Sequence, residues 1–172
     1  MSIRGYFRYN FPMEKTKSLT EKIIHKLAEE NKSVTFAESC TGGRIAAAFT
    51  AVSGASAVLN GSCVTYSNEI KHRWLGVEQD VLERYGAVSE ECVSQMLDGI
   101  VKMAEADYSL AVSGIAGPTG GTPLKPVGTV YIGILTPESK EIHHCLFKGE
   151  REAVQQQSVA FAIEKLASKL GI

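Results

Sequence analysis

Apolar positions follow two periods along the chain, and together they predict alternating helices and strands. Helical spacing predicts helices from Ser18, where Ser18-Leu-Thr-Glu21 fits a capping box, and over 44–52, 70–85 in short pieces, 89–104 and 151–170. Apolar or alternating runs predict strands at 34–37, 61–66, 108–113, 127–135 and 142–147. Because a hairpin-like pair comes late, we expect a single layered α/β/α domain with a mixed β-sheet.

Composition narrows the class of protein. The 172 residues suit one domain, with 44% hydrophobic and 22% charged residues and a formal net charge of −1. The near-neutral net charge predicts no nucleic-acid-binding surface. No apolar run approaches the roughly 20 residues of a membrane helix. The four cysteines form no C-x-x-C pair, which favours reduced thiols and a cytoplasmic protein without a metal or cofactor.

The first residues differ from the rest of the chain. Residues 1–13 carry basic and aromatic side chains, but they lack both helical periodicity and the apolar core of a secretory signal. We therefore divide the chain into an N-terminal extension, 1–13, and a domain, 14–172. The extension is either a plain leader to the domain or a short partner-binding arm.

The first candidate site is Ser39, within Ala37-Glu-Ser-Cys-Thr-Gly-Gly43. It lies between a predicted strand and a predicted helix, where glycines permit a tight turn and free amides can stabilise developing negative charge. The spacing matches neither G-x-S-x-G nor the P-loop nor the dinucleotide-binding motif. The alternative is that Ser39 or Thr41 only caps the helix.

A serine nucleophile needs a base, and none of the four histidines is well placed to serve. His143 and His144 are adjacent on a strand and face opposite ways, so they would not bind one metal together. A lysine can replace histidine where burial lowers its pKa, and Lys71 follows the turn at Tyr66-Ser-Asn68. Periodicity alone favours the alternative, that Lys71 is a solvated surface charge.

A second glycine-rich loop follows the strand at 108–113. It begins with Ser113 and Gly114 and runs to Gly121, so its amides could bind a phosphate, with Lys125 or Arg151 as counter-charge. The alternative is a long surface turn.

These segments, taken in order, resemble one family. The sequences concerned are Ala37-Glu-Ser-Cys-Thr-Gly-Gly43, Val64-Thr-Tyr-Ser-Asn68 with Lys71, Gly86-Ala-Val-Ser89, Ser113-Gly-Ile-Ala-Gly-Pro118 and Lys125-Pro-Val-Gly-Thr129. The chain is similar to the CinA C-terminal-domain family from about Leu19 to Leu170. Enzymatic members of that family are nicotinamide-nucleotide amidases.

The resemblance implies hydrolysis of nicotinamide mononucleotide to nicotinate mononucleotide and ammonia, by a homo-oligomer in pyridine-nucleotide salvage. It implies that Ser39 is the nucleophile, Lys71 the base and Tyr66 their assistant, with Cys40 as a rival nucleophile. The amides around Thr41, Gly42 and Gly43 would hold the oxyanion. Ser113 with Gly114 would lie near the substrate, and Arg151 would meet its phosphate.

One alternative function remains open at this point. A non-catalytic nucleotide-binding or regulatory module could keep the same fold and the same glycine loops. Longer CinA proteins also carry a preceding domain that resembles molybdopterin-binding proteins. The resemblance places no part of this sequence in that domain, so its activity is not expected here.

Overall fold

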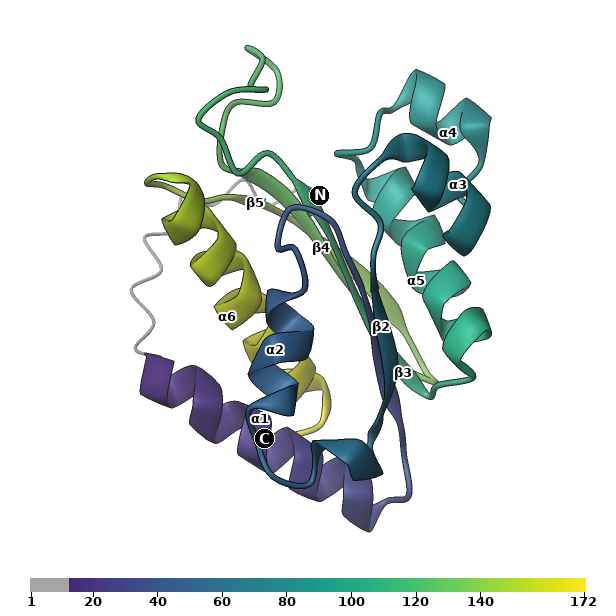
Figure 1. Ribbon diagram of the computed structural model, residues 1–172, viewed down its shortest axis with the longest axis vertical. Coiled ribbons are helices and arrows are strands. Elements are labelled where there is room, and N and C mark those ends of the chain that lie inside the picture. The colour runs from purple at the N-terminus through teal and green to yellow at the C-terminus, as the bar shows by residue number, and fades with distance from the viewer. Residues whose placement is uncertain (1–12) are drawn as a thin grey trace.

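The computed structural model describes residues 13–172, so residues 1–12 of the predicted extension lie outside the described part of the chain. Helices and strands alternate through the first two-thirds and end with a hairpin and a long helix (Figure 1). The elements are α1 (Met13–Glu29), β1 (Val34–Glu38), α2 (Arg44–Thr50), a 3-10 turn (Ala55–Ala57), β2 (Leu59–Val64), α3 (Asn68–Leu75), α4 (Gln79–Arg84), α5 (Glu90–Ala104), β3 (Tyr108–Gly114), β4 (Thr129–Leu135), β5 (Lys140–Leu146) and α6 (Arg151–Lys169).

The five strands form one mixed sheet in the order β2-β1-β3-β4-β5. Strand β1 pairs in parallel with β2 and β3, whereas β3 with β4 and β4 with β5 are antiparallel. The predicted late hairpin is therefore confirmed. The carboxyl ends of β1, β2 and β3 meet at one edge, which is where open α/β sheets bind ligands.

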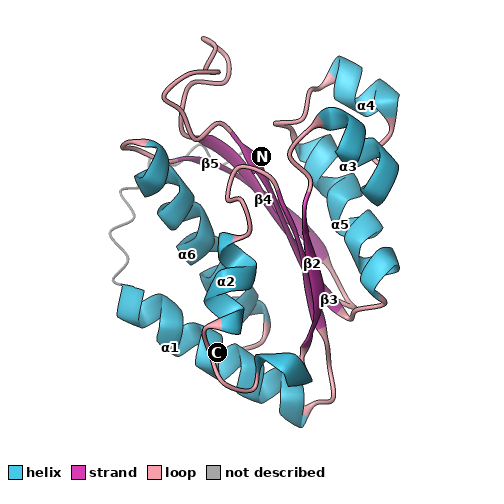
Figure 2. Cartoon of the chain, viewed as in Figure 1, coloured by secondary structure: helices cyan, strands magenta, loops and turns pink. Residues whose placement is uncertain are grey.

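Helices cover both faces of this sheet. Helices α1, α2 and α6 lie on one side and α3, α4 and α5 on the other (Figures 1 and 2). Each side has its own apolar cluster, and β1, buried at all five positions, contributes to both. The predicted three-layer α/β/α class is confirmed. The helix predicted at 44–52 is shorter than expected and buries only Ile45 and Phe49.

The start of the first helix was predicted wrongly. Helix α1 begins at Met13, so Ser18 is an exposed interior position and not the first residue of a capping box. Residues 14–17, Glu-Lys-Thr-Lys, are mostly good helix formers, and Glu14 in the first turn suits the positive end of the helix dipole. These preferences extend the helix beyond the capping signal.

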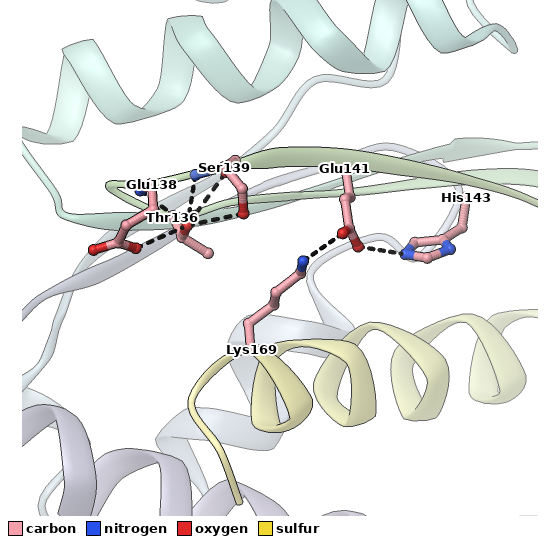
Figure 3. A network of polar contacts seen from close by, with 6 residues as sticks. All are labelled: Thr136, Glu138, Ser139, Glu141, His143 and Lys169. Atoms are coloured by element: carbon pink, nitrogen blue, oxygen red, sulfur yellow. Dashed lines mark hydrogen bonds and ion pairs between the residues drawn. The ribbon is translucent and has the colours of Figure 1, made fainter.

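A polar network ties the β4–β5 hairpin to the end of α6 (Figure 3). At the turn, the Thr136 hydroxyl accepts a hydrogen bond from the Ser139 amide at 2.9 Å. Beyond it, Glu141 pairs with Lys169 of α6 and lies 3.6 Å from His143 Nε2. The half-buried His143 ring packs edge-on against Phe161, with 5.4 Å between ring centroids. The hairpin is thereby fixed to the helix that carries Arg151.

Burial makes His143 sensitive to acid. Desolvation lowers the pKa of His143, Lys165 and Lys169 lower it further, and Glu141 acts in the opposite direction. The unfolded chain therefore binds a proton more readily than the folded one, and folding stability falls as pH drops below the unfolded histidine pKa of about 6.5. We expect His143→Phe, which keeps an aromatic ring against Phe161, to lose less stability than the wild type between pH 7 and pH 5. Urea unfolding at several pH values measures this, and equal losses in the two proteins would refute the assignment.

Candidate active site

The turn that follows β1 is held by a buried carboxylate. Glu38, the last residue of β1, is fully buried and accepts hydrogen bonds from the amides of Gly43 at 3.1 Å, Ile45 at 3.1 Å and Ala46 at 2.9 Å. A carboxylate at a helix N-terminus satisfies amides that lack partners within the helix and also suits the helix dipole. Glu38 therefore fixes the first turn of α2, and with it the position of the adjacent Ser39. The sequence analysis did not assign Glu38 a role.

The two glycines of this turn allow its backbone conformation and donate hydrogen bonds within it. Gly42 and Gly43 have φ of 60° and 92°, which a residue with a side chain rarely adopts. The Gly42 amide donates to the Ser39 carbonyl at 3.0 Å, and the Gly43 amide donates to Glu38. The expectation that these two amides hold an oxyanion is therefore corrected, because both already have acceptors within the protein.

Lys71 lies against Ser39. Lys71 Nζ is 3.0 Å from Ser39 Oγ and donates to the Thr65 carbonyl at 2.6 Å. Helix α3 begins directly after β2 because the Ser67 hydroxyl caps it, accepting a hydrogen bond from the Ile70 amide at 3.2 Å. This early start turns Lys71 inward in the first turn of the helix. The side chain is 1% exposed, so Lys71 is a buried group and not a solvated surface charge.

Burial changes the acid–base character of the site. Desolvation lowers the pKa of Lys71, against a weaker opposite effect from Cys92 and Cys40. An amine with a lowered pKa can accept a proton from a neighbouring hydroxyl. Burial also raises the pKa of the Cys40 thiol, to about 12, which keeps it protonated and weakly nucleophilic. Ser39, 8% exposed, is the hydroxyl in contact with the Lys71 amine.

Three other residues predicted for the site are buried or half-buried near the ends of β1 and β3. Ser113 Oγ donates to the Ala87 carbonyl at 2.7 Å, which ties the end of β3 to the segment before α5. Thr41 is fully buried, and its hydroxyl has no hydrogen-bond partner among residues 13–172. Gly114, the last residue of β3, is half-buried. A substrate contact by Ser113, Thr41 or Gly114 remains a prediction.

Tyr66 and Arg151 are joined to each other. Arg151, the first residue of α6, donates to the Tyr66 hydroxyl at 2.8 Å and to the Gly117 carbonyl at 2.8 Å. Tyr66 is 63% exposed. None of the hydrogen bonds within residues 13–172 joins its hydroxyl to Ser39 or Lys71.

A pocket of about 920 Å³ opens at the turn that follows Ser39, where Cys40 and Gly42 line it, whereas Ser39 and Lys71 are not among its lining residues. It combines the Ser39 turn, the second glycine loop and the start of α6, and includes three residues predicted for the site: Gly42, Tyr66 and Arg151. The sequence analysis missed Arg44 and Gln155, which are about 110 residues apart in the chain. Gln155 Nε2 donates to the Cys40 carbonyl at 2.8 Å and so links α6 to the Ser39 turn. The full lining is Cys40, Gly42, Arg44, Tyr66, Ala116, Pro118, Val127, Gly149, Glu150, Arg151, Glu152 and Gln155.

The described part of the chain has neither a metal-binding cluster nor a membrane-spanning helix. It holds no cluster of three or more histidine, cysteine, aspartate or glutamate side chains able to bind a metal ion. None of the helices between residues 13 and 172 has the length and apolar character that crossing a membrane requires.

Comparison with known proteins agrees with this arrangement. Residues 16–170 match the CinA C-terminal domain. The chain belongs to the CinA family. A CinA-like protein of Thermotoga neapolitana is 43% identical over 166 residues, which are 96% of this chain and 40% of the relative. A CinA-like protein of Endomicrobium trichonymphae is 47% identical over 144 residues, 84% of this chain and 34% of the relative. The chain thus spans about 40% or less of the length of these curated relatives.

Solved structures of CinA proteins share the whole fold. A CinA superfamily protein from Klebsiella pneumoniae has a TM-score of 0.87 and 40% identity, covering 91% of this chain and 98% of that one. A competence/damage inducible protein from Agrobacterium tumefaciens has a TM-score of 0.88 and 34% identity over the full length of both chains. The mixed sheet with helices on both faces is therefore the CinA fold.

The hydrogen bonds of Glu38 can be tested through stability. We expect Glu38→Ala to lower the free energy of unfolding by about 2–4 kcal/mol, because three amides at the start of α2 would lose a fully buried carboxylate acceptor. Glu69→Gln, which removes an exposed carboxylate paired with Arg73 on α3, should change it by less than about 1 kcal/mol. Urea unfolding measures both variants. A loss below about 1 kcal/mol for Glu38→Ala would show that Glu38 does not hold the turn.

The burial of Lys71 predicts that its removal, unlike that of Glu38, does not lower the free energy of unfolding at pH 7. Because the pKa of Lys71 is lowered in the folded state, the unfolded chain binds more protons, and wild-type stability rises with pH towards about 10.4. Lys71→Met keeps the volume without the charge, so it should be at least as stable as the wild type at pH 7, with the difference shrinking at pH 9–10. Urea unfolding at pH 7, 8, 9 and 10 tests this. A variant less stable than the wild type at every pH would contradict it.

Proposed function

We propose that this chain hydrolyses the carboxamide of nicotinamide mononucleotide, releasing ammonia and nicotinate mononucleotide. The observation that carries the proposal is the 3.0 Å contact between Ser39 Oγ and the buried amine of Lys71. A buried lysine beside a serine is a known alternative to histidine as the base of a hydrolase. This pair lies at the carboxyl edge of the parallel strands, and Cys40, the residue after Ser39, lines the pocket.

The first step is attack by the serine. One N–H of Lys71 is directed to the Thr65 carbonyl, which orients the amine so that its lone pair can face Ser39. Neutral Lys71 takes the hydroxyl proton as Oγ bonds to the carboxamide carbon, and the carbonyl oxygen becomes an oxyanion. The Thr65 carbonyl then stabilises the resulting ammonium.

The oxyanion needs amide donors close to Ser39. Since the Gly42 and Gly43 amides donate within the protein, we assign this role to the amides of Cys40 and Thr41 in the same turn. One such donor commonly contributes about 2.7–4 kcal/mol to transition-state stabilisation. The turn is held by Glu38 from one side and by Gln155 from the other, so these amides would need little reorganisation during the reaction.

The second half of the reaction releases ammonia and then hydrolyses the acyl-enzyme. The Lys71 ammonium returns its proton to the leaving nitrogen, the carbon–nitrogen bond breaks, and ammonia departs from the acyl-enzyme. A water molecule then attacks the ester carbon while Lys71 accepts its proton. Collapse of that intermediate gives the carboxylate and regenerates Ser39. No oxidant or reductant is required.

The pocket favours a phosphorylated amide. Its volume of about 920 Å³ lies within the range of small-molecule sites. Arg44 and Arg151 supply cationic groups, and the side chain of Glu150 makes no capping hydrogen bond at the start of α6, which leaves amides at the positive end of a 19-residue helix. Apolar side chains of Ala116 and Val127 can contact a planar ring.

Ammonia release from nicotinamide mononucleotide tests the proposal. We expect turnover by the wild type and a loss on the order of 10³-fold or more in Ser39→Ala and in Lys71→Met, because each change removes one member of a unit that acts together. Matched controls are Ser168→Ala, an exposed serine of α6, and Lys102→Met in the last turn of α5, both expected to keep wild-type rates.

Two results would overturn this assignment. Near-wild-type turnover by Ser39→Ala would exclude the serine as nucleophile. Saturable binding of nicotinamide mononucleotide with no ammonia release by the wild type would instead identify a nucleotide-binding or regulatory module.

A further inference from the structure

We infer that the Tyr66–Arg151 hydrogen bond makes catalysis conditional on an anionic group in the substrate. An anion that binds Arg151 would release the Tyr66 hydroxyl, which can then turn to the Ser39–Lys71 pair. This inference rests on the proposed amidase function. It assigns Arg151 and Tyr66 a joint role in substrate specificity.

Arg151 joins three walls of the pocket. It begins α6, and its guanidinium donates to Tyr66, which follows β2, and to Gly117 in the loop that follows β3. Tyr66, Arg151 and the neighbouring Pro118 all line the pocket. A substrate that enters the pocket therefore meets a guanidinium with two of its five N–H groups engaged, one on Nη1 and one on Nη2, and an anion that takes these two N–H groups competes with both acceptors.

The competition favours an anion over the phenol. Both acceptors that Arg151 has are uncharged, and no ion pair within residues 13–172 includes Arg151. A phosphate can accept two parallel charge-assisted hydrogen bonds from a guanidinium, and each is roughly twice as strong as a neutral one. Glu150 and Glu152 also line the pocket and repel an anion, which favours direct contact between the anion and the Arg151 guanidinium.

Tyr66 is placed to act once it is released. It directly follows Thr65, whose carbonyl accepts a hydrogen bond from Lys71 Nζ at 2.6 Å, so its backbone adjoins the proposed base. Its side chain is 63% exposed and can change rotamer without opening the apolar core. The phenol oxygen accepts the bond from Arg151 and keeps its own O–H as a donor, so the bond restrains where the hydroxyl lies and not whether it can donate. A freed phenol can reach the reacting groups and relay the proton of the Lys71 ammonium to the leaving nitrogen of the amide.

The inference separates two effects that a phosphate can have on rate. If Arg151 bound the phosphate equally in the ground state and the transition state, removing the phosphate would raise KM and leave kcat unchanged. If Arg151 also holds Tyr66 back, a substrate without phosphate should react with lower kcat, because the phenol stays in its hydrogen bond with the arginine. Nicotinamide mononucleotide and nicotinamide riboside differ only by the phosphate and so form the matched pair of substrates.

Steady-state kinetics of both substrates test the coupling. We expect Tyr66→Phe to lower kcat for the mononucleotide but to leave kcat for the riboside unchanged. We expect Arg151→Met to raise kcat for the riboside, by about five- to tenfold, since one hydrogen bond that restrains the phenol is lost. Tyr85→Phe, at an exposed tyrosine outside the pocket, and Arg73→Met, on the surface of α3, should change neither value. A riboside kcat that falls in Arg151→Met would overturn the inference.

A second measurement does not depend on turnover. In Ser39→Ala protein with 13C-labelled tyrosine, the Tyr66 resonance, assigned by its loss in Tyr66→Phe, reports the surroundings of the hydroxyl. We expect saturating nicotinamide mononucleotide or inorganic phosphate to shift it and saturating riboside to leave it unchanged. An unchanged resonance at saturating phosphate would overturn the inference. A shifted resonance in a protein whose wild type releases no ammonia would instead refute only the proposed function.

Discussion

The arrangement of this molecule depends on one buried amine. Lys71 Nζ lies between the Ser39 hydroxyl and the Thr65 carbonyl, almost completely removed from solvent. A charged ammonium in such a place is costly, which is why the pKa of Lys71 is lowered, and a lowered pKa favours the neutral amine that the proposed base requires. The burial that lowers the stability of the charged protein is thus the same feature that makes the proposed chemistry possible.

The fold supplies what this amine requires. The parallel pairing of β1 with β2 brings the end of one strand, with Ser39, beside the end of the other, with Thr65. The Ser67 cap starts α3 at once and turns Lys71 inward, while Glu38 and Gln155 hold the serine turn from opposite sides. On the outer side of the pocket, Arg151 connects α6 to the tyrosine next to Thr65. In the proposed mechanism, substrate charge and acid–base chemistry are linked through the neighbouring residues Thr65 and Tyr66.

Local patterns predicted the local parts of this arrangement. The strand–glycine turn–helix unit around Ser39 and the late antiparallel hairpin are short-range features, and both were visible in the sequence. Burial of Lys71 was not visible, because it arises when α3 packs against α5 and brings Lys71 to Ser39 and Thr65, and periodicity alone allowed a surface position. Glu38 was missed because a charged residue at a strand end is ordinarily solvated. Only its place directly before a helix start hinted at its role. The Tyr66–Arg151 bond joins residues 85 apart, which no local pattern encodes.

The acid–base state of Lys71 can be observed directly. With 15N-labelled lysine, the Nζ resonance of Lys71, assigned by its absence in Lys71→Met, can be followed by NMR through a pH titration. The account predicts that this amine loses its proton clearly below the value of about 10.4 for a free lysine side chain. A Lys71 amine that titrates at or above that value would contradict the serine–lysine mechanism.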